Sequence, residues 1–192
     1  TLFNHEGLKR GEEFVTRKIT KGVAKAREEF FDTSKWIDGL PPKVTPIELG
    51  NLDAKRDWSD SEDFVEGVWK MLQMDDPRDY LLASGETHSI KEFAERAFFH
   101  AGLKNVYWEG EGVDEKLFLD HEGKHQVILV KVNPVFYRPA EVELLWGDPS
   151  ETQKVLNWKP KISFDKLVER MVLCDIELRE QQNAQKHRTQ QM

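Results

Sequence analysis

The chain has 192 residues, of which 39% are hydrophobic and 33% are charged. This length and apolar content are sufficient for one ordinary globular core, which excludes disorder as the dominant state. The formal net charge of −7 at pH 7 excludes general nucleic-acid binding through a basic face. No apolar run approaches the roughly 20 residues of a membrane span, and the mean hydropathy is −0.65, so we expect no membrane association.

The single cysteine and the first residues indicate where the protein works and how much of it is present. Cys174 has no second cysteine with which to form an internal disulfide, which favours a reducing compartment, and we expect the cytoplasm. The chain begins Thr1-Leu2-Phe3-Asn4, a pattern typical of the end of a buried strand. We therefore expect it to be part of a longer protein.

Strand and helix patterns alternate along the first half, which is typical of α/β architecture with a largely parallel sheet. Apolar residues recur at three- to four-residue spacings over 14–31 and predict an amphipathic helix, followed by a loop over 32–46. A strand is predicted at 47–49. The next helix begins at the Ser59 and Glu62 capping box, and its apolar face consists of Phe64, Val65, Val68, Trp69 and Leu72.

The second half continues the alternation. A buried strand is predicted at 80–83, and a second capping box, Ser89 and Glu92, begins a helix that ends at Gly102. Strands are predicted at 106–108 and 127–130, separated by a glycine-bearing acidic stretch over 109–115. Asp148 begins a short helix and Ser163 a longer one, and the residues after about Arg179 are predicted to form a polar, frayed tail.

Several common chemical motifs are absent from the sequence. The glycines form neither a Gly-x-Gly-x-x-Gly nor a Gly-x-x-x-x-Gly-Lys-Ser/Thr loop, so the chain has no usual phosphate-cradling loop. There is no Gly-x-Ser-x-Gly elbow to supply a serine nucleophile. His121 and His125 are four residues apart in a glycine-containing loop, which is more typical of surface histidines than of a metal site. We expect no metal.

Two arginines are candidate anion ligands. Arg56 lies between a predicted strand end and a capped helix, where ligands bind in α/β sheets, and its guanidinium can bind phosphate oxygens bidentately. Asp57 is a candidate to hold that guanidinium, although a surface ion pair between the two side chains explains the spacing equally well. Arg138 precedes Pro139, which favours an extended backbone, but such an arginine is more often solvated.

The segment 4–11 leads through a glycine-bounded loop to the first predicted helix. Arg17 and Lys18 near the start of that helix can meet an anion at the strand ends. The other basic residues of the helix, Lys21, Lys25 and Arg27, are more typical of its solvated face.

Seven segments in order resemble GDP-mannose 4,6-dehydratase. They are residues 4–6, 14–20, 49–58, 84–89, 108–115, 138–142 and 147–149, and the resemblance runs from Asn4 to about Ile176. Two features depart from the family pattern: the stretch 32–45 is longer than the usual loop, and Gly7-Leu8 replaces the usual Ser-Pro.

The resemblance implies an extended short-chain dehydrogenase/reductase, in which an NADP-binding Rossmann domain precedes a smaller α/β nucleotide-sugar-binding domain. Residues 1–180 would then be the C-terminal portion, with the last Rossmann elements and the substrate-binding domain interleaved, and 181–192 a polar tail. The implied activity is that of a lyase. Bound NADP takes hydride from C4 of the mannose, water leaves from C5 and C6, and hydride returns to C6. The product is GDP-4-keto-6-deoxymannose, the first intermediate toward GDP-fucose, and the family forms homodimers or homotetramers.

The resemblance also assigns roles to single residues. The glycine-rich loop, the Thr or Ser, the glutamate base and the Tyr-x-x-x-Lys pair lie upstream in the family, so we expect no catalytic residue in this chain. His5 and Arg10 match NADP contacts. Asn4, Lys18, Arg56 and Arg138 match substrate contacts, the two arginines at the diphosphate, and Leu49, Gly50, Asn51 and Glu141 match the nucleoside side.

Two other functions remain open at this point. A protein without the Rossmann half would be inactive and could bind nucleotide sugars or mediate assembly. A related epimerase or reductase of GDP sugars would share the arginines and differ only in upstream residues.

Overall fold

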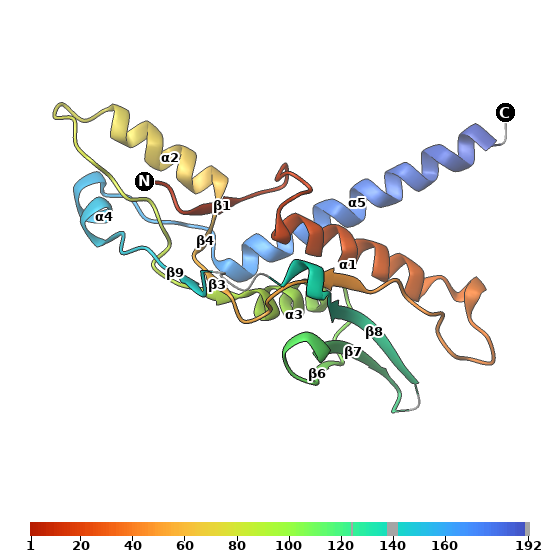
Figure 1. The fold of residues 1–192 in the computed structure, drawn as a ribbon. Coiled ribbons are helices and arrows are strands. Elements are labelled where there is room, and N and C mark those ends of the chain that lie inside the picture. Colours follow the sequence, from red (N-terminus) through yellow and green to blue (C-terminus); the bar gives the residue numbers. More distant parts are fainter. Residues whose placement is uncertain (124, 138–141, 191–192) are drawn as a thin grey trace.

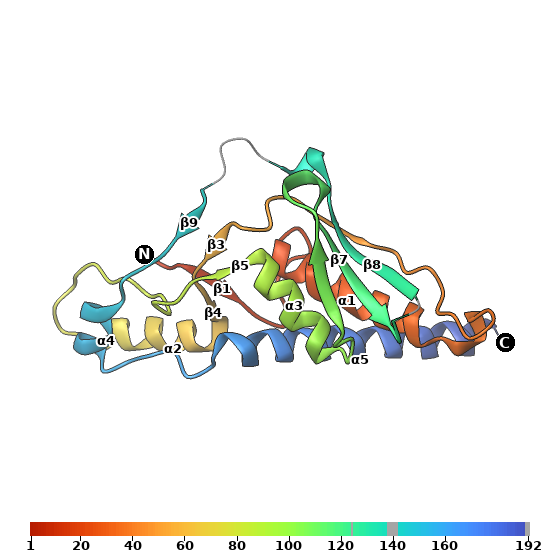
Figure 2. The same ribbon diagram turned by 90° about the horizontal axis from the view of Figure 1, so that it is seen from below.

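The computed structural model describes residues 1–123, 125–137 and 142–190 (Figure 1). Helices α1 (Val15–Phe31) and α3 (Ile90–His100) lie side by side, between a four-stranded sheet on one face and helix α5 (Phe164–Gln190) on the other (Figures 1 and 2). The predicted amphipathic helix is confirmed, since Ile19 and Val23 of α1 are fully buried. The capping of α3 is also confirmed, because Ser89 Oγ accepts from Glu92 N at 3.0 Å.

The four-stranded sheet has the order β2-β8-β7-β6. Its strands are β2 (Ile47–Leu49), β6 (Val106–Glu109), β7 (Lys116–His121) and β8 (His125–Val132). Only β2 and β8 run parallel, so the prediction of a largely parallel sheet is wrong here. Strand β7 was not predicted, and His121 and His125 are paired across the β7–β8 hairpin instead of lying in an irregular loop.

Two smaller sheets complete the α/β fold, the class that the sequence predicted. Strand β1 (Asn4–Glu6) pairs in parallel with β4 (Trp58–Asp60). Strand β3 (Lys55–Arg56) lies between β5 (His88–Ser89) and β9 (Leu144–Leu145). The predicted strand at 80–83 is wrong, because only a single bridge joins Leu82 to Leu2, although Leu82 is fully buried.

The buried apolar residues form two clusters. The larger lies among α1, α3, α5 and the four-stranded sheet. The smaller, made of Phe64, Leu82, Leu156 and Trp158, lies between α2 (Ser61–Leu72) and α4 (Ser150–Leu156). Segments of the two clusters alternate along the chain, but a division into Rossmann and substrate-binding parts remains a prediction.

The start of α2 differs from the prediction. Ser59 belongs to β4, and its buried hydroxyl has no hydrogen-bond partner among the described residues. Asp60 caps the helix instead, because its Oδ1 accepts from Glu62 N at 2.9 Å. The predicted Ser59–Glu62 capping box is therefore wrong by one position.

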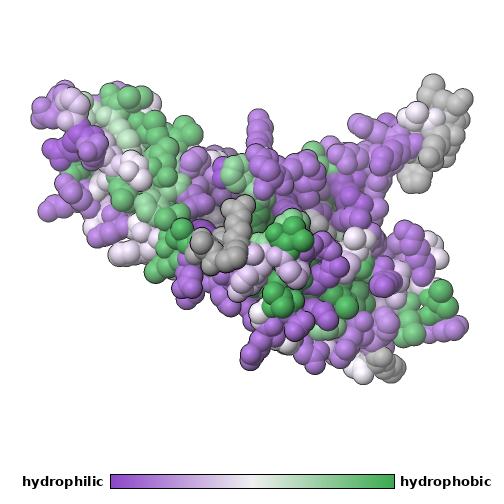
Figure 3. Space-filling model, in the orientation of Figure 1, coloured by the Kyte–Doolittle hydropathy of each residue, from purple (hydrophilic) through white to green (hydrophobic). Residues whose placement is uncertain are grey.

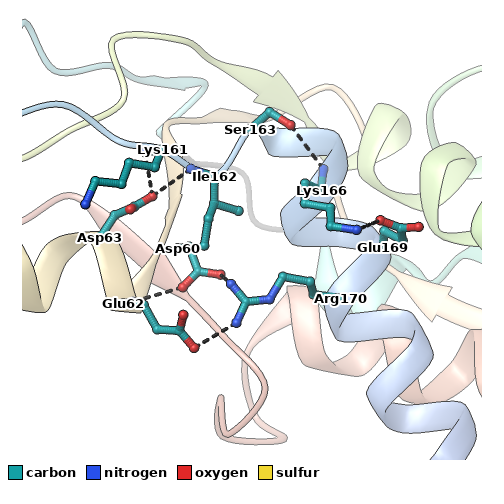
Figure 4. A network of polar contacts seen from close by, with 9 residues as sticks. All are labelled: Asp60, Glu62, Asp63, Lys161, Ile162, Ser163, Lys166, Glu169 and Arg170. Carbon is teal, nitrogen blue, oxygen red and sulfur yellow. Dashed lines mark hydrogen bonds and ion pairs between the residues drawn. The ribbon is translucent and has the colours of Figure 1, made fainter.

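The same end of α2 is tied to α5 by polar contacts (Figure 4). Arg170 of α5 donates from Nη1 to Asp60 Oδ2 at 2.9 Å and from Nη2 to Glu62 Oε1 at 2.7 Å. Asp63 Oδ2 accepts from the backbone N–H groups of Lys161 and Ile162 at 3.0 and 2.9 Å. These contacts join the two apolar clusters.

The predicted apolar face of α2 is divided between the interior and the surface. Phe64 is buried, whereas Val65, Trp69 and Leu72 are 69%, 59% and 77% exposed. Figure 3 shows apolar side chains gathered along the arm of the molecule that α2 occupies.

The residues that follow Arg179 are helical as far as Gln190, which differs from the prediction. Helix α5 continues to Gln190, so the frayed tail expected after about Arg179 is wrong. Arg179 and Glu180 form ion pairs with Glu28 and Arg27 of α1. None of the helices in the described part of the chain combines the length and the hydrophobicity of a membrane span.

The stretch 32–45 is a loop, as predicted, with one short 3-10 turn, η1 (Thr33–Lys35). Trp36 fixes it to the rest of the molecule. Its indole Nε1 donates to the Phe30 carbonyl at 2.9 Å, and its ring centroid lies 5.2 Å from that of His121.

Candidate functional site

Two cavities lie beside strand β1. The first, called here the Lys18 cavity, has a volume of about 300 Å³, and its lining includes Asn4, Lys18, Leu49, Gly50, Asn51 and Arg56. The second, called here the Arg10 cavity, has about 310 Å³ and is lined in part by His5 and Arg10. Asn4 lines both cavities. The residues matched to the sugar nucleotide therefore collect in one cavity and those matched to NADP in the other, while Arg138 and Glu141 lie outside the described residues.

In the Lys18 cavity, the ammonium group of Lys18 lies 3.9 Å from the centroid of the Phe136 ring. Burial lowers the pKa of Lys18, and the nearby Glu48 carboxylate opposes this effect. Arg17, the preceding residue, points elsewhere: its Nη2 pairs with Asp175 Oδ1 at 2.9 Å, and the residue is 8% exposed. Of the two basic residues predicted to meet an anion, only Lys18 reaches the cavity.

Phe136 is a cavity residue that sequence reasoning missed. It ends the 3-10 turn η3 (Pro134–Phe136), whose N-cap Asn133 accepts from Val135 N at 2.9 Å and donates to Glu48 Oε2 at 2.7 Å. A Cβ atom at Gly50 would lie 2.3 Å from the Phe136 carbonyl oxygen, which explains why glycine is required there. The Asn133-Pro134 pair was the available signal, because an N-cap residue followed by proline is typical of the start of a helical turn.

Arg56 lies in the wall of the Lys18 cavity on strand β3. Its Nη1 donates to the carbonyl groups of Lys55 and Val142 at 2.9 and 2.6 Å. Asp57 does not hold this guanidinium, because its carboxylate accepts from Ser84 N, Ser84 Oγ and Gly85 N at 2.7 to 2.9 Å. Asp57 is also fully buried, so the alternative of a surface Arg56–Asp57 pair is wrong as well.

In the Arg10 cavity, both predicted residues are fixed by neighbours. The Arg10 Nε atom lies 3.0 Å from Glu6 Oε2, and its Cζ atom lies 3.4 Å from the centroid of the Phe14 ring. His5 Nδ1 lies 2.8 Å from the Phe3 carbonyl oxygen, which can only accept, so Nδ1 carries the proton.

The described residues contain no grouping of three or more His, Cys, Asp or Glu side chains that could hold a metal ion. The described residues that line the two cavities include the basic side chains of Lys18, Arg56 and Arg10 and the acidic side chains of Glu6 and Glu13. Burial raises the pKa of Glu6, an effect opposed by its contacts with Thr16 and Arg10. The three basic side chains are of the kind that binds phosphate groups.

Solved structures share the fold of this chain. The structure of RMD from Pseudomonas aeruginosa complexed with NADPH matches 92% of this chain with a TM-score of 0.66 and 17% sequence identity, over 47% of that chain. UDP-glucose 4-epimerase from Thermotoga maritima, solved with UDP-glucose, matches the same share with a TM-score of 0.63 and 14% identity. These likenesses show that the chain shares its α/β fold with parts of both structures.

The sequence comparisons then give the family. The sequence model for GDP-mannose 4,6 dehydratase matches residues 1–171. The chain is 46% identical over 177 residues to GDP-mannose 4,6 dehydratase of Drosophila melanogaster and 44% identical over 177 residues to that of Homo sapiens. It thus belongs to the GDP-mannose 4,6 dehydratase family, which confirms the resemblance. Each alignment covers 92% of this chain but only 40% and 43% of the two relatives.

Proposed function

We propose that this chain is the substrate-binding portion of a GDP-mannose 4,6-dehydratase, a lyase that converts GDP-mannose to GDP-4-keto-6-deoxymannose with bound NADP. The observation that carries the proposal is the sorting of residues between two adjacent cavities. The residues matched to the sugar nucleotide line the Lys18 cavity, those matched to NADP line the Arg10 cavity, and Asn4 lines both. A reaction between two ligands requires this adjacency.

In this proposal, the Lys18 cavity binds GDP-mannose. Arg56 and Lys18 supply positive charge for the diphosphate, and the guanidinium of Arg56 adds directed hydrogen bonds. Leu49, Gly50 and Asn51 lie along the cavity wall and contact the nucleoside side. We assign Arg138 to the diphosphate and Glu141 to the nucleoside side on the resemblance alone.

The residues of the Arg10 cavity fit the phosphate groups of NADP. The Arg10 side chain is held at Nε and along one face, and within the described residues its Nη1 and Nη2 atoms donate no hydrogen bond. These donors and His5 would hold an anionic nucleotide beside Asn4. When bound, NADP supplies the reversible hydride acceptor that the reaction needs.

The proposal requires the remaining part of the family's longer polypeptide, which would supply the catalytic residues. Two features support the presence of a surface on which that remaining part packs. Strand β1 pairs on one edge with β4 within the described residues, and α2 exposes Val65, Trp69 and Leu72. An exposed apolar stripe beside an open strand edge is typical of a surface that another element covers. A homodimer or homotetramer and a cytoplasmic location belong to the same proposal.

The test is a turnover assay on the full-length enzyme that contains this chain, with GDP-mannose and NADP. We expect mass spectrometry to show the loss of one water from GDP-mannose. GDP-mannose binding by titration calorimetry without any product would instead support the non-catalytic alternative. A product of unchanged mass would indicate an epimerase, and a reduced sugar would indicate a reductase.

A further inference from the structure

Glu6 lies between the two cavities and has no assigned role. It is the last residue of β1, is 2% exposed and lines the Lys18 cavity. Its Oε2 atom accepts from Thr16 Oγ1 at 2.6 Å and lies 3.0 Å from Nε of Arg10, which lines the other cavity. One buried carboxylate in the wall of the Lys18 cavity therefore contacts the basic residue of the Arg10 cavity.

Arg10 is held from two directions. Its Nε–H is not aligned with the Glu6 oxygen for a hydrogen bond, so the contact is an ion pair. The Phe14 ring covers one face of the guanidinium, 3.4 Å from Cζ. With the Nε edge and one face occupied, the terminal nitrogens are the donors left for an anion.

We propose that Glu6 is the positioning residue for Arg10. Its carboxylate fixes the guanidinium in the wall of the Arg10 cavity, so that the terminal nitrogens bind a phosphate group there. A long side chain fixed before binding loses less rotamer freedom when the anion arrives, which strengthens binding. The identification of that phosphate as part of NADP rests on the proposed function, whereas the positioning of Arg10 does not.

The first test needs no ligand and uses the full-length enzyme that contains this chain. In Glu6→Gln, Arg10 loses its charged partner while the acceptor for Thr16 is kept. The matched control Glu12→Gln removes the same charge from an exposed ion pair with Lys21 that lies in the lining of neither cavity. We measure the rate at which phenylglyoxal modifies Arg10, by peptide mass mapping, and expect a several-fold increase in Glu6→Gln alone. An unchanged rate would overturn the proposal.

A second variant guards against a failure of Glu6→Gln to fold. Phe14 is 40% exposed, so Phe14→Leu should preserve the fold while removing the ring from the Arg10 guanidinium. We expect faster modification of Arg10 in this variant too. Modification no faster than in the wild type would contradict the view that Arg10 is held between Glu6 and Phe14.

The third measurement separates positioning from general disruption. Titration of NADPH fluorescence should show binding weakened about tenfold in Glu6→Gln, with GDP-mannose affinity changed less than about threefold. Equal losses for both ligands would overturn the positioning role. A wild-type enzyme that binds no NADPH would refute the proposed function, while the modification rates would still decide whether Glu6 positions Arg10.

Discussion

Arg17 and Lys18 are neighbours with the same charge, yet α1 places them in opposite environments. Successive residues of a helix point about 100° apart, so Arg17 turns toward Asp175 of α5 while Lys18 lines the cavity beside Phe136. The pattern of basic residues alone could not separate the two, although the resemblance matched only Lys18 to a substrate contact. The packing of α5 against α1 made that choice.

The charge of Arg56 should matter for substrate binding. We expect Arg56→Ala to weaken GDP-mannose binding by roughly 2–4 kcal/mol, because a charged contact in a partly enclosed site is lost. Titration calorimetry on the full-length enzyme measures the change. Lys55→Ala, which removes a charge from the adjacent exposed residue of β3, should leave the affinity nearly unchanged. Equal effects of the two variants would remove Arg56 from the diphosphate site.

Asp175 gives a prediction with a defined pH dependence. Burial raises its pKa above the ordinary value of 3.8, although Thr20, Arg17 and Lys21 oppose the shift. A carboxyl whose pKa is raised in the folded state favours folding most at low pH, and this contribution is lost as pH rises through the folded-state pKa.

Asp175→Asn should be less stable than the wild type throughout, because Arg17 loses its buried partner. The difference in the free energy of unfolding between the wild type and Asp175→Asn should become smaller as pH rises from about 3.5 to 7, because only the wild type has a carboxyl that titrates at position 175. Urea unfolding of both proteins at several pH values in this range measures the difference. A difference that widens with pH would contradict the raised pKa.

At the scale of elements, length decided what could be predicted. The helices predicted at 14–31 and 90–102 are long enough for apolar residues to recur at a regular spacing. Their ends were predicted to within about two residues. Strands β3, β5 and β9 have two residues each, too few for any alternation to show. Yet β3 carries Arg56, so an element that periodicity cannot detect positions a candidate site residue.

The turn η3 should depend on its cap. We expect Asn133→Ala to lower the free energy of unfolding by about 1 kcal/mol, since the contacts to Val135 N and Glu48 are both lost. GDP-mannose binding should weaken as well, because Phe136 no longer holds a fixed place beside Lys18. Asn105→Ala, at an exposed position, is the matched control. Full stability and affinity in Asn133→Ala would show that the cap does not position η3.

At the scale of the whole molecule, two apolar clusters are joined by contacts between α2 and α5. We expect Arg170→Ala to cost about 2 kcal/mol of stability, because the buried Asp60 carboxylate loses a charged partner. Lys166→Ala removes an exposed ion pair with Glu169 from the same helix and should cost less than about 0.5 kcal/mol. Thermal and urea unfolding measure both. Similar losses would show that Arg170 does not join the clusters.

The candidate site is also formed only when the whole molecule is folded. Asn4, Arg56 and Phe136 come from distant parts of the chain and meet at the Lys18 cavity. The resemblance named Asn4 and Arg56 as ligands without showing how they meet. Glu6 and Phe136 were missed because their importance comes from the residues that they touch.

The sequence by itself determined the α/β class, the long helices, the family and most of the candidate ligands, because periodicity, caps and ordered motifs are local properties of the chain. Only the tertiary structure decided that Asp60 caps α2, that α5 stays helical to Gln190 and that Arg17 is a core residue. It also decided that Glu6 contacts Arg10. The positions of Arg17 and of the end of α5 depend on contacts between segments far apart in the chain, whose pairing leaves no local signal. Asp60 and Glu6 contact residues only two and four positions away, but through a backbone conformation that the residue pattern alone does not specify.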